Sequence, residues 1–183
     1  MKRCLLFLIL LVLCMVCRAQ KPLNRTTKST IKPLTATDRK NYVMTIDPIA
    51  VFMTKYSLPK DNDYNKSVLF VPVKFTNNSN DTLRYLTMTC SWEEFYTTDN
   101  HEVAIIPGRN CDTNFPKDLI LRPHKSIKLT VPVVKIHGGK KFRIGMILIK
   151  VDQKNDSFYL IEKALSLSNK DKYTIWSNLI ELP

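Results

Sequence analysis

Glycine and histidine are scarce in this chain, and their scarcity argues against several kinds of catalytic site. Only four glycines occur in 183 residues, and none flanks a serine, as the tight turn of a serine nucleophile requires. The chain also has no glycine-rich loop of the kind that cradles phosphates. The three histidines, His101, His124 and His137, do not have the spacing of a metal-binding motif. The sequence therefore predicts a protein that is not an enzyme and that has no metal site and no cofactor.

Long apolar runs are also missing beyond the N-terminus. The run at residues 5–17 is shorter than the roughly 20 residues that a membrane-spanning helix needs. Basic residues precede it and a small residue follows it, which is typical of a secretory signal peptide over residues 1–19, cleaved before Gln20. The alternatives are an uncleaved anchor and a lipid attached to Cys14 or Cys17. We expect a mature chain without a membrane span that is secreted, periplasmic or part of the cell envelope.

Acidic residues are few, with 16 against 28 basic residues. Three basic residues leave with the signal peptide, so the mature chain has 25 basic residues and a net charge of +9. Such a charge favours weak, salt-sensitive binding to polyanions. The sequence offers no motif for specific binding of nucleic acid.

Only two cysteines remain after removal of the signal peptide, Cys90 and Cys111. An even pair in an exported chain predicts a disulfide, because an oxidising compartment preserves it. Closing this loop would stabilise the fold by about 3 kcal/mol. The alternative is two free thiols, with Cys90 acting as a small buried apolar residue.

The clearest pattern that is present lies in residues 68–92, where two runs of strand-forming residues flank the polar cluster of residues 77–81. A cluster of Asn, Ser and Asp suits a turn, so we expect a hairpin. Alternation predicts one inward face on each strand. The expected inward residues are Leu69, Val71, Val73, Phe75, Leu86, Met88, Cys90 and Trp92.

Further strands are predicted along the rest of the chain. They cover residues 42–53 (interrupted near Pro48), 101–106, 125–134, 141–151 and 173–182. Residues 109–124 are expected to be irregular, residues 158–167 fit a strand or a short helix, and residues 20–41 read as a flexible basic linker. Seven or eight short strands with turns between them predict an all-β fold, a single antiparallel β-sandwich over residues 42–183.

The strand spacing and the closing segment at residues 175–178 resemble immunoglobulin-like or fibronectin-type-III-like domains of exported bacterial proteins. The resemblance covers residues 42–183 and implies an immunoglobulin-like antiparallel sandwich. The chain departs from true immunoglobulin domains, because Trp92 follows Cys90 by two residues and Cys111 lies in a proline-rich segment. The resemblance implies no particular activity, since such folds have many functions.

We expect a non-catalytic binding or interaction module, because loops on a rigid sandwich commonly carry recognition. Its expected partner is a protein or a glycan of the envelope. The alternatives are a structural accessory subunit of an envelope assembly and a hydrolytic enzyme with an unrecognised site. The candidate binding residues are Phe95, Tyr96, His137, Lys140, Lys141 and Arg143. The two aromatic residues fit equally a cap on the core, and the basic residues fit a solubilising rim.

Asparagine-linked glycosylation motifs occur five times. Their asparagines are Asn24, Asn65, Asn77, Asn80 and Asn155. All five fall in predicted turns or in the linker, so we expect exposed side chains at these positions.

Overall fold

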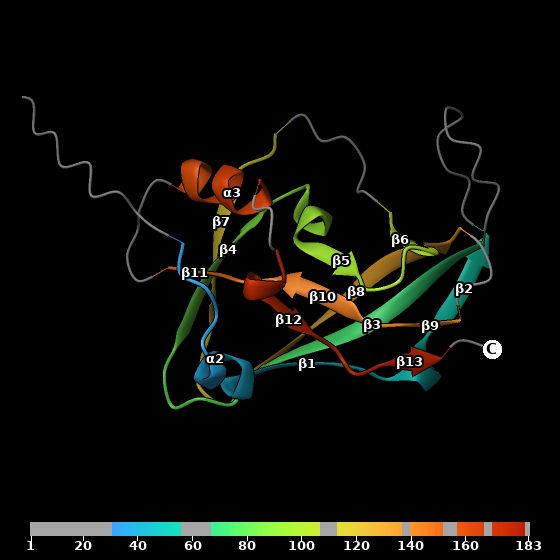
Figure 1. Ribbon diagram of the computed structural model, residues 1–183, viewed down its shortest axis with the longest axis horizontal. Helices are drawn as coiled ribbons and strands as arrows, with labels where there is room; N and C mark the ends of the chain where they lie inside the picture. Colours follow the sequence, from blue (N-terminus) through green and yellow to red (C-terminus); the bar gives the residue numbers. More distant parts are fainter. Residues whose placement is uncertain are drawn as a thin grey trace, which may run out of the picture.

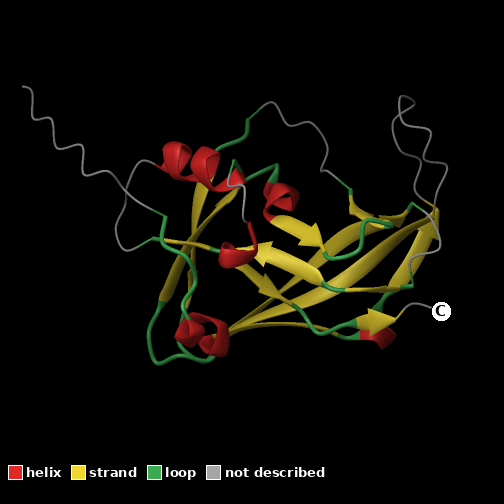
Figure 2. Ribbon diagram, in the orientation of Figure 1, coloured by secondary structure: helices red, strands yellow, loops and turns green. Residues whose placement is uncertain are grey.

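The computed structural model describes residues 31–55, 67–106, 113–136, 140–151, 157–166 and 170–181. Over these ranges the fold is rich in strands that form antiparallel sheets, as predicted, and the helices lie at the periphery (Figures 1 and 2). The strands are β1 (Tyr42–Ile46), β2 (Phe52–Lys55), β3 (Ser67–Asn77), β4 (Leu83–Met88), β5 (Tyr96–Thr98), β6 (Val103–Ile105), β7 (Pro116–Leu121), β8 (Ser126–Lys135), β9 (Lys141–Phe142), β10 (Ile144–Ile147), β11 (Ile149–Lys150), β12 (Thr174–Trp176) and β13 (Ile180–Glu181). The helices are α2 (Ala36–Asn41), α3 (Ser157–Leu165) and the short 3-10 helices η1 (Pro48–Ala50), η2 (Trp92–Phe95) and η3 (Lys170–Tyr173). None of the described helices is long and apolar enough to cross a membrane.

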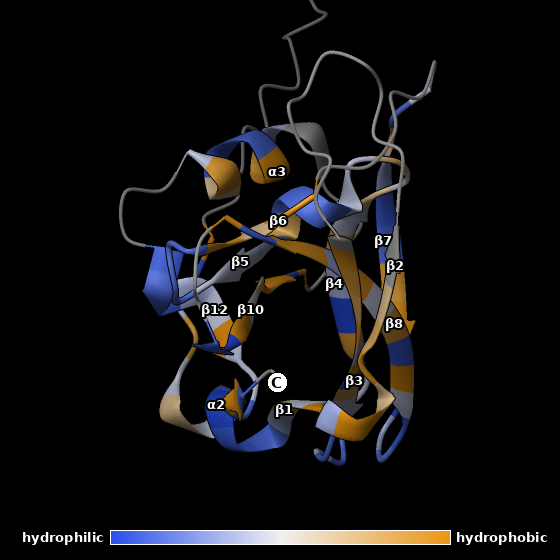
Figure 3. Cartoon of the chain, turned by 90° about the vertical axis from the view of Figure 1, so that its right-hand side faces the viewer, coloured by the Kyte–Doolittle hydropathy of each residue, from blue (hydrophilic) through white to orange (hydrophobic). Residues whose placement is uncertain are grey.

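The largest sheet has the order β1-β3-β8-β6, and β2 also pairs with β3. Its inward face was predicted correctly, because alternate residues of β3 are buried while Lys74 is exposed. Strand β8 repeats this alternation, which appears as orange and blue bands in Figure 3. The inward residues of β3 are Leu69, Val71, Val73 and Phe75. Burial of these side chains stabilises the sheet by about 1.5–3 kcal/mol per residue.

The predicted hairpin at residues 68–92 is wrong. Strand β3 pairs with β1, β2 and β8, whereas the next strand, β4, pairs with β7 and β11 in another sheet. The two sheets meet across the core, where the rings of Phe75 and Tyr85 pack edge to face at 5.8 Å. Alternation predicts which face of a strand is buried, but it does not identify the neighbouring strand.

Asn77 holds the corner at which the chain changes sheets. Its side chain is fully buried, and its Nδ2 donates hydrogen bonds to the carbonyl oxygens of Asp81 and Leu121 at 2.7 and 3.0 Å. Its Oδ1 accepts hydrogen bonds from the backbone N–H and the hydroxyl of Ser79. The Asn77 amide therefore provides hydrogen-bond partners for the turn after β3 and for the end of β7. These two segments are far apart in the sequence, and a simple hairpin would not connect them.

The expectation that every glycosylation motif is exposed is also wrong at Asn77, because its Nδ2, the atom that a glycan would modify, is buried and donates two hydrogen bonds. Asn80 is exposed, and its Oδ1 lies 3.0 Å from Nε2 of His124. The other three motifs lie outside the described residues.

Strand β4 is shorter than predicted. It ends at Met88, so Cys90 and Trp92 lie beyond it and are half-buried, while Leu86 and Met88 are buried as expected. The prediction that residues 109–124 are irregular is wrong for β7, which pairs with β4 over its whole length. β7 contains Pro116 and pairs with a single strand among the described residues, as proline-containing edge strands do.

The strand predicted over residues 141–151 is divided into β9, β10 and β11, each with different partners. Ser177 accounts for one interruption, since its hydroxyl accepts a hydrogen bond from the N–H of Ile144 at 3.0 Å. The segment at residues 158–167 is helical, as α3. Its apolar side buries Leu160, Ile161 and Ala164, and α3 lies over β4 and β7 at the upper left of Figure 1.

The last part of the segment predicted as a flexible linker belongs to the folded structure. Thr35 and Asp38 form a reciprocal capping box that starts α2. The Arg39 guanidinium donates hydrogen bonds to the carbonyl oxygens of Thr174 and Asp171. The Asp38 carboxylate forms an ion pair with Lys150 of β11. Burial alone would raise the pKa of Asp38, but the hydrogen bonds from Lys150 and Thr35 hold that pKa below its usual value.

Candidate functional site

A pocket of about 230 Å³ lies between the sheets, and we call it the inter-sheet pocket. Its walls come from β4, β5, β7, β8, β10 and η2 and from the turn that follows β4. The lining residues are Tyr85, Leu86, Thr87, Met88, Thr89, Trp92, Phe95, Tyr96, Lys117, Leu119, Leu129, Met146 and Ile147. Segments far apart in the sequence thus enclose one mostly apolar space.

Aromatic rings and thioethers form much of the wall. The rings of Trp92 and Tyr96 meet edge to face with centroids 5.6 Å apart, and the Tyr96 hydroxyl donates a hydrogen bond to Sδ of Met146 at 3.4 Å. Burial raises the pKa of Tyr85 to about 12. Burial, together with the neighbouring Tyr85, also raises the pKa of Tyr96. Both phenols are therefore neutral at physiological pH, and these two rings add no charge to the wall.

Thr87 and Lys117 place polar groups at the edge of the same pocket. They are direct partners across the β4–β7 pair, so their side chains project from the same face of that sheet. Lys117 is exposed and Thr87 is half-buried, which puts them on the solvent side of the lining. Asp118, the adjacent carboxylate, projects from the opposite face of β7. None of the ion pairs found among the described residues involves Lys117.

Two of the predicted binding residues, Phe95 and Tyr96, line this pocket. Phe95 ends η2 and Tyr96 begins β5, so a single turn places both rings against the core. Their burial agrees with the alternative that they cap the core. Because they also border the pocket, they could contact a bound molecule.

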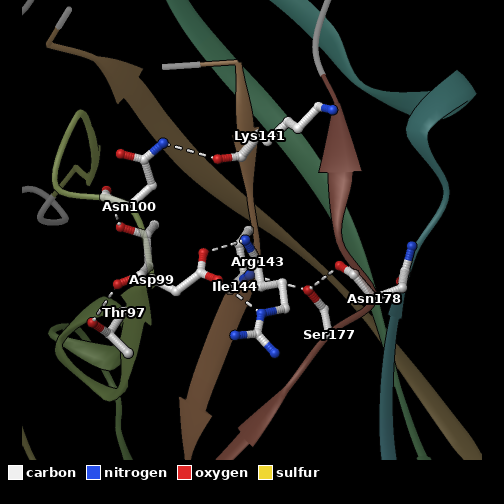
Figure 4. A network of polar contacts seen from close by, with 9 residues as sticks. Thr97, Asp99, Asn100, Lys141, Arg143, Ile144, Ser177 and Asn178 are labelled. Atoms are coloured by element: carbon white, nitrogen blue, oxygen red, sulfur yellow. Dashed lines mark hydrogen bonds and ion pairs between the residues drawn. The ribbon is translucent and has the colours of Figure 1, made fainter.

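The predicted basic residue Arg143 lies elsewhere, in a polar network shown in Figure 4. Its backbone N–H and its Nε donate hydrogen bonds to the two carboxylate oxygens of Asp99, at 2.6 and 2.8 Å. Its guanidinium carbon also lies 5.4 Å from the centre of the Trp176 ring. Burial alone would raise the pKa of Asp99, but the hydrogen bonds from Arg143 lower it. The cation of Arg143 is therefore already engaged by neighbouring side chains, although the residue is exposed.

Gly145 explains how the Trp176 ring can lie close to Arg143. Gly145 pairs with Trp176 on one side and with Thr97 on the other. A Cβ atom at Gly145 would lie 2.7 Å from the indole ring and 2.5 Å from the side chain of Thr174. The missing side chain thus allows the indole to lie across β10. Tyr96 and Met146 are the next pair in the register and lie on the other face of this sheet, the pocket side.

The remaining predicted residues do not gather at a common site. Lys141 forms an exposed ion pair with Glu181 at 3.2 Å, Lys140 is exposed, and His137 lies outside the described residues. The structure thus divides the five candidates that it describes into an aromatic pair in the pocket and three basic residues on the surface. Weak binding to polyanions stays a prediction.

The disulfide also stays a prediction, because Cys111 lies outside the described residues. The described part of the chain places Cys90 close to the segment that follows Cys111. The N–H of Cys90 donates a hydrogen bond to Oδ1 of Asn114 at 3.1 Å, and its Sγ lies 3.2 Å from the carbonyl oxygen of Thr113.

Within the described ranges, no three His, Cys, Asp or Glu side chains come together where they could hold a metal ion. The chain matches no protein-family model, no curated protein and no solved structure. The candidate site is therefore assigned from its own geometry.

Sequence reasoning missed the polar edge of the pocket. Residues 109–124 were predicted to be irregular, so no strand face was considered for Lys117 and Leu119. The short apolar run at residues 119–121 is the signal that could have revealed β7. Even with that strand, the partnership of Thr87 and Lys117 depends on a register that only the three-dimensional structure supplies.

Proposed function

We propose that this protein is an exported, non-catalytic binding module whose binding site is the inter-sheet pocket. The observation that carries the proposal is a space of about 230 Å³ with aromatic, aliphatic and thioether walls and a polar edge on its solvent side. Concave apolar sites with a few placed polar groups are the usual form of a ligand site. The bound group is apolar, either a free molecule or part of a partner.

The composition of the lining supports binding over hydrolysis. Hydrolytic sites combine a nucleophile or an activated water with a general acid or base. No histidine, cysteine, aspartate or glutamate occurs among the lining residues. The two tyrosines are neutral, since burial raises pKa values that already lie well above physiological pH, and Lys117 is the one basic residue of the lining.

We also propose that the sheets form one immunoglobulin-like sandwich and that the module acts outside the cytoplasm. The chain changes sheets between β3 and β4 and again between β7 and β8, as strands of a two-layer sandwich do. The signal-peptide pattern at residues 1–19 supports export. A structural accessory subunit that receives a partner's apolar group is compatible with the same pocket.

The test is a titration of the mature protein with 4-phenylbutanol, a neutral probe with one ring, followed by NMR. We expect saturable shifts of the methyl signals of Met88 and Met146 and of the indole N–H signal of Trp92. Leu119→Trp should abolish the shifts by filling the pocket. Ile120→Trp is the matched control, because Ile120 is the next residue of the same strand and is 53% exposed. Shifts that are absent in the wild type, or that survive Leu119→Trp, would overturn the proposal.

A further inference from the structure

We infer that the ligand of the inter-sheet pocket is a small carboxylic acid with a single ring or a short apolar chain. This inference rests on the proposed function and adds the chemical class of the ligand. The carboxylate would bind at Thr87 and Lys117, and the apolar part would lie between the aromatic and methionine side chains. Size, lining and charge each support one part of the assignment.

The size of the pocket limits the apolar part. A cavity of roughly 150 Å³ accommodates benzene, whereas pockets for drug-sized ligands occupy roughly 300–1,000 Å³. The inter-sheet pocket has about 230 Å³ and lies between these values. It therefore fits one ring with a short side arm.

The composition of the lining favours a free molecule over a peptide segment. The lining comes from five strands, a 3-10 helix and a turn, and the pocket is open on one side. An extended peptide would need a groove that continues along a strand. A half-open pocket built from many short contributions instead receives one compact group.

The polar edge supplies the charge and the hydrogen-bond donors for a carboxylate. Lys117 provides an ammonium group and Thr87 a hydroxyl, and their registry across β4 and β7 puts both on one face. The described residues give neither side chain an ion pair or a hydrogen-bond partner. Neither Asp118, the neighbour of Lys117 in β7, nor Glu93, which is buried in η2, lines the pocket. An anion at this edge would therefore meet complementary charge without a competing acidic side chain in the lining.

The experiment compares two probes of the same shape, 4-phenylbutyrate and 4-phenylbutanol, on the mature protein by calorimetry and NMR. We expect the carboxylate to bind roughly tenfold more tightly than the alcohol, the scale of one charge-assisted hydrogen bond. Lys117→Met should remove this difference, because it should weaken binding of the carboxylate far more than binding of the alcohol. Thr87→Val should reduce the difference in part.

Lys128→Met is the matched control, because Lys128 is an exposed lysine on the outward face of β8. It should leave both affinities unchanged, which separates a local effect of Lys117 from an effect of net charge. Equal affinity for the two probes in the wild type would overturn the carboxylate assignment while the pocket remained a binding site. Binding of neither probe would overturn the proposed function as well. Tight binding only of a peptide carrying an acidic residue beside an aromatic one would replace the small acid with a peptide ligand.

Discussion

Arg143 lies near the ring of Trp176, and Lys117 lines a pocket that contains aromatic side chains. The two basic residues differ in whether their charge is compensated by neighbouring side chains. Arg143 forms an ion pair with the carboxylate of Asp99 (Figure 4). Its guanidinium also lies 5.4 Å from the centre of the Trp176 ring, so its charge is already compensated. Lys117 lies at the edge of an apolar pocket and takes part in none of the ion pairs among the described residues. The proposal assigns recognition to Lys117 because no ion pair among the described residues compensates its charge, which a count of charges does not reveal.

The largest expected effect concerns the predicted disulfide. Cys90 lies just before η2, which contributes Trp92 and Phe95 to the pocket. A bridge at Cys90 would therefore hold the part of the molecule that contains Lys117 and the pocket. Cys111→Ser should lower the free energy of unfolding by about 3 kcal/mol, because the unfolded chain regains loop entropy. Thermal unfolding of wild type and variant measures the loss. Two titratable thiols in the unfolded, non-reduced wild type would refute the bridge.

Gly145→Ala tests the position of the Trp176 ring, which lies against Gly145 and close to the Arg143 guanidinium. The new Cβ would lie 2.5 Å from Thr174 and 2.7 Å from the Trp176 ring, so the indole must shift. We expect a loss of about 1–3 kcal/mol in the free energy of unfolding, the usual cost of overpacking. Denaturant unfolding measures it, and binding of 4-phenylbutanol to the folded variant should persist because the pocket lies on the other face of the sheet. Unchanged stability would show that the indole does not lie across Gly145 in solution.

Arg143→Met and Lys117→Met form a matched pair that tests the comparison itself. Removing Arg143 should cost about 1 kcal/mol, the sum of a partly exposed ion pair and a cation–π contact. Removing Lys117 should change stability by less than about 0.5 kcal/mol, as is usual for exposed residues without partners. Equal losses in chemical denaturation would contradict the distinction between an engaged and an available cation.

A smaller effect is expected in the pH dependence of stability. The pKa of Asp99 is lowered in the folded protein by Arg143, so the stabilising contribution of Asp99 is complete above the ordinary pKa of an aspartate. That contribution is lost as the pH falls through the lower folded pKa. Asp99→Asn should therefore be less stable than the wild type at neutral pH, and the gap should narrow on acidification. Lys117→Met should follow the wild-type profile, and a gap for Asp99→Asn that stays constant with pH would refute the assignment.

The sequence predicted the β-rich antiparallel character and the inward faces of β3 and β8, because alternation is a local property of each strand. It did not predict the partners of β3 and β4, because those depend on the buried amide of Asn77, whose bonds reach residues 81 and 121. It named Phe95 and Tyr96 as candidate binding residues because they are aromatic and were expected in a loop. It missed Thr87 and Lys117, since their proximity arises from cross-strand register between segments 30 residues apart in the chain.

The central claim is that the inter-sheet pocket binds small carboxylic acids. The measurement that tests it most directly is the position of bound 4-phenylbutyrate in the protein. Intermolecular NOEs should connect the phenyl protons of 4-phenylbutyrate with the methyl groups of Met88 and Met146 and with the indole of Trp92. Contacts to the indole of Trp176 instead, beside Arg143, would contradict the account, because they would place recognition at the cation that the fold already compensates.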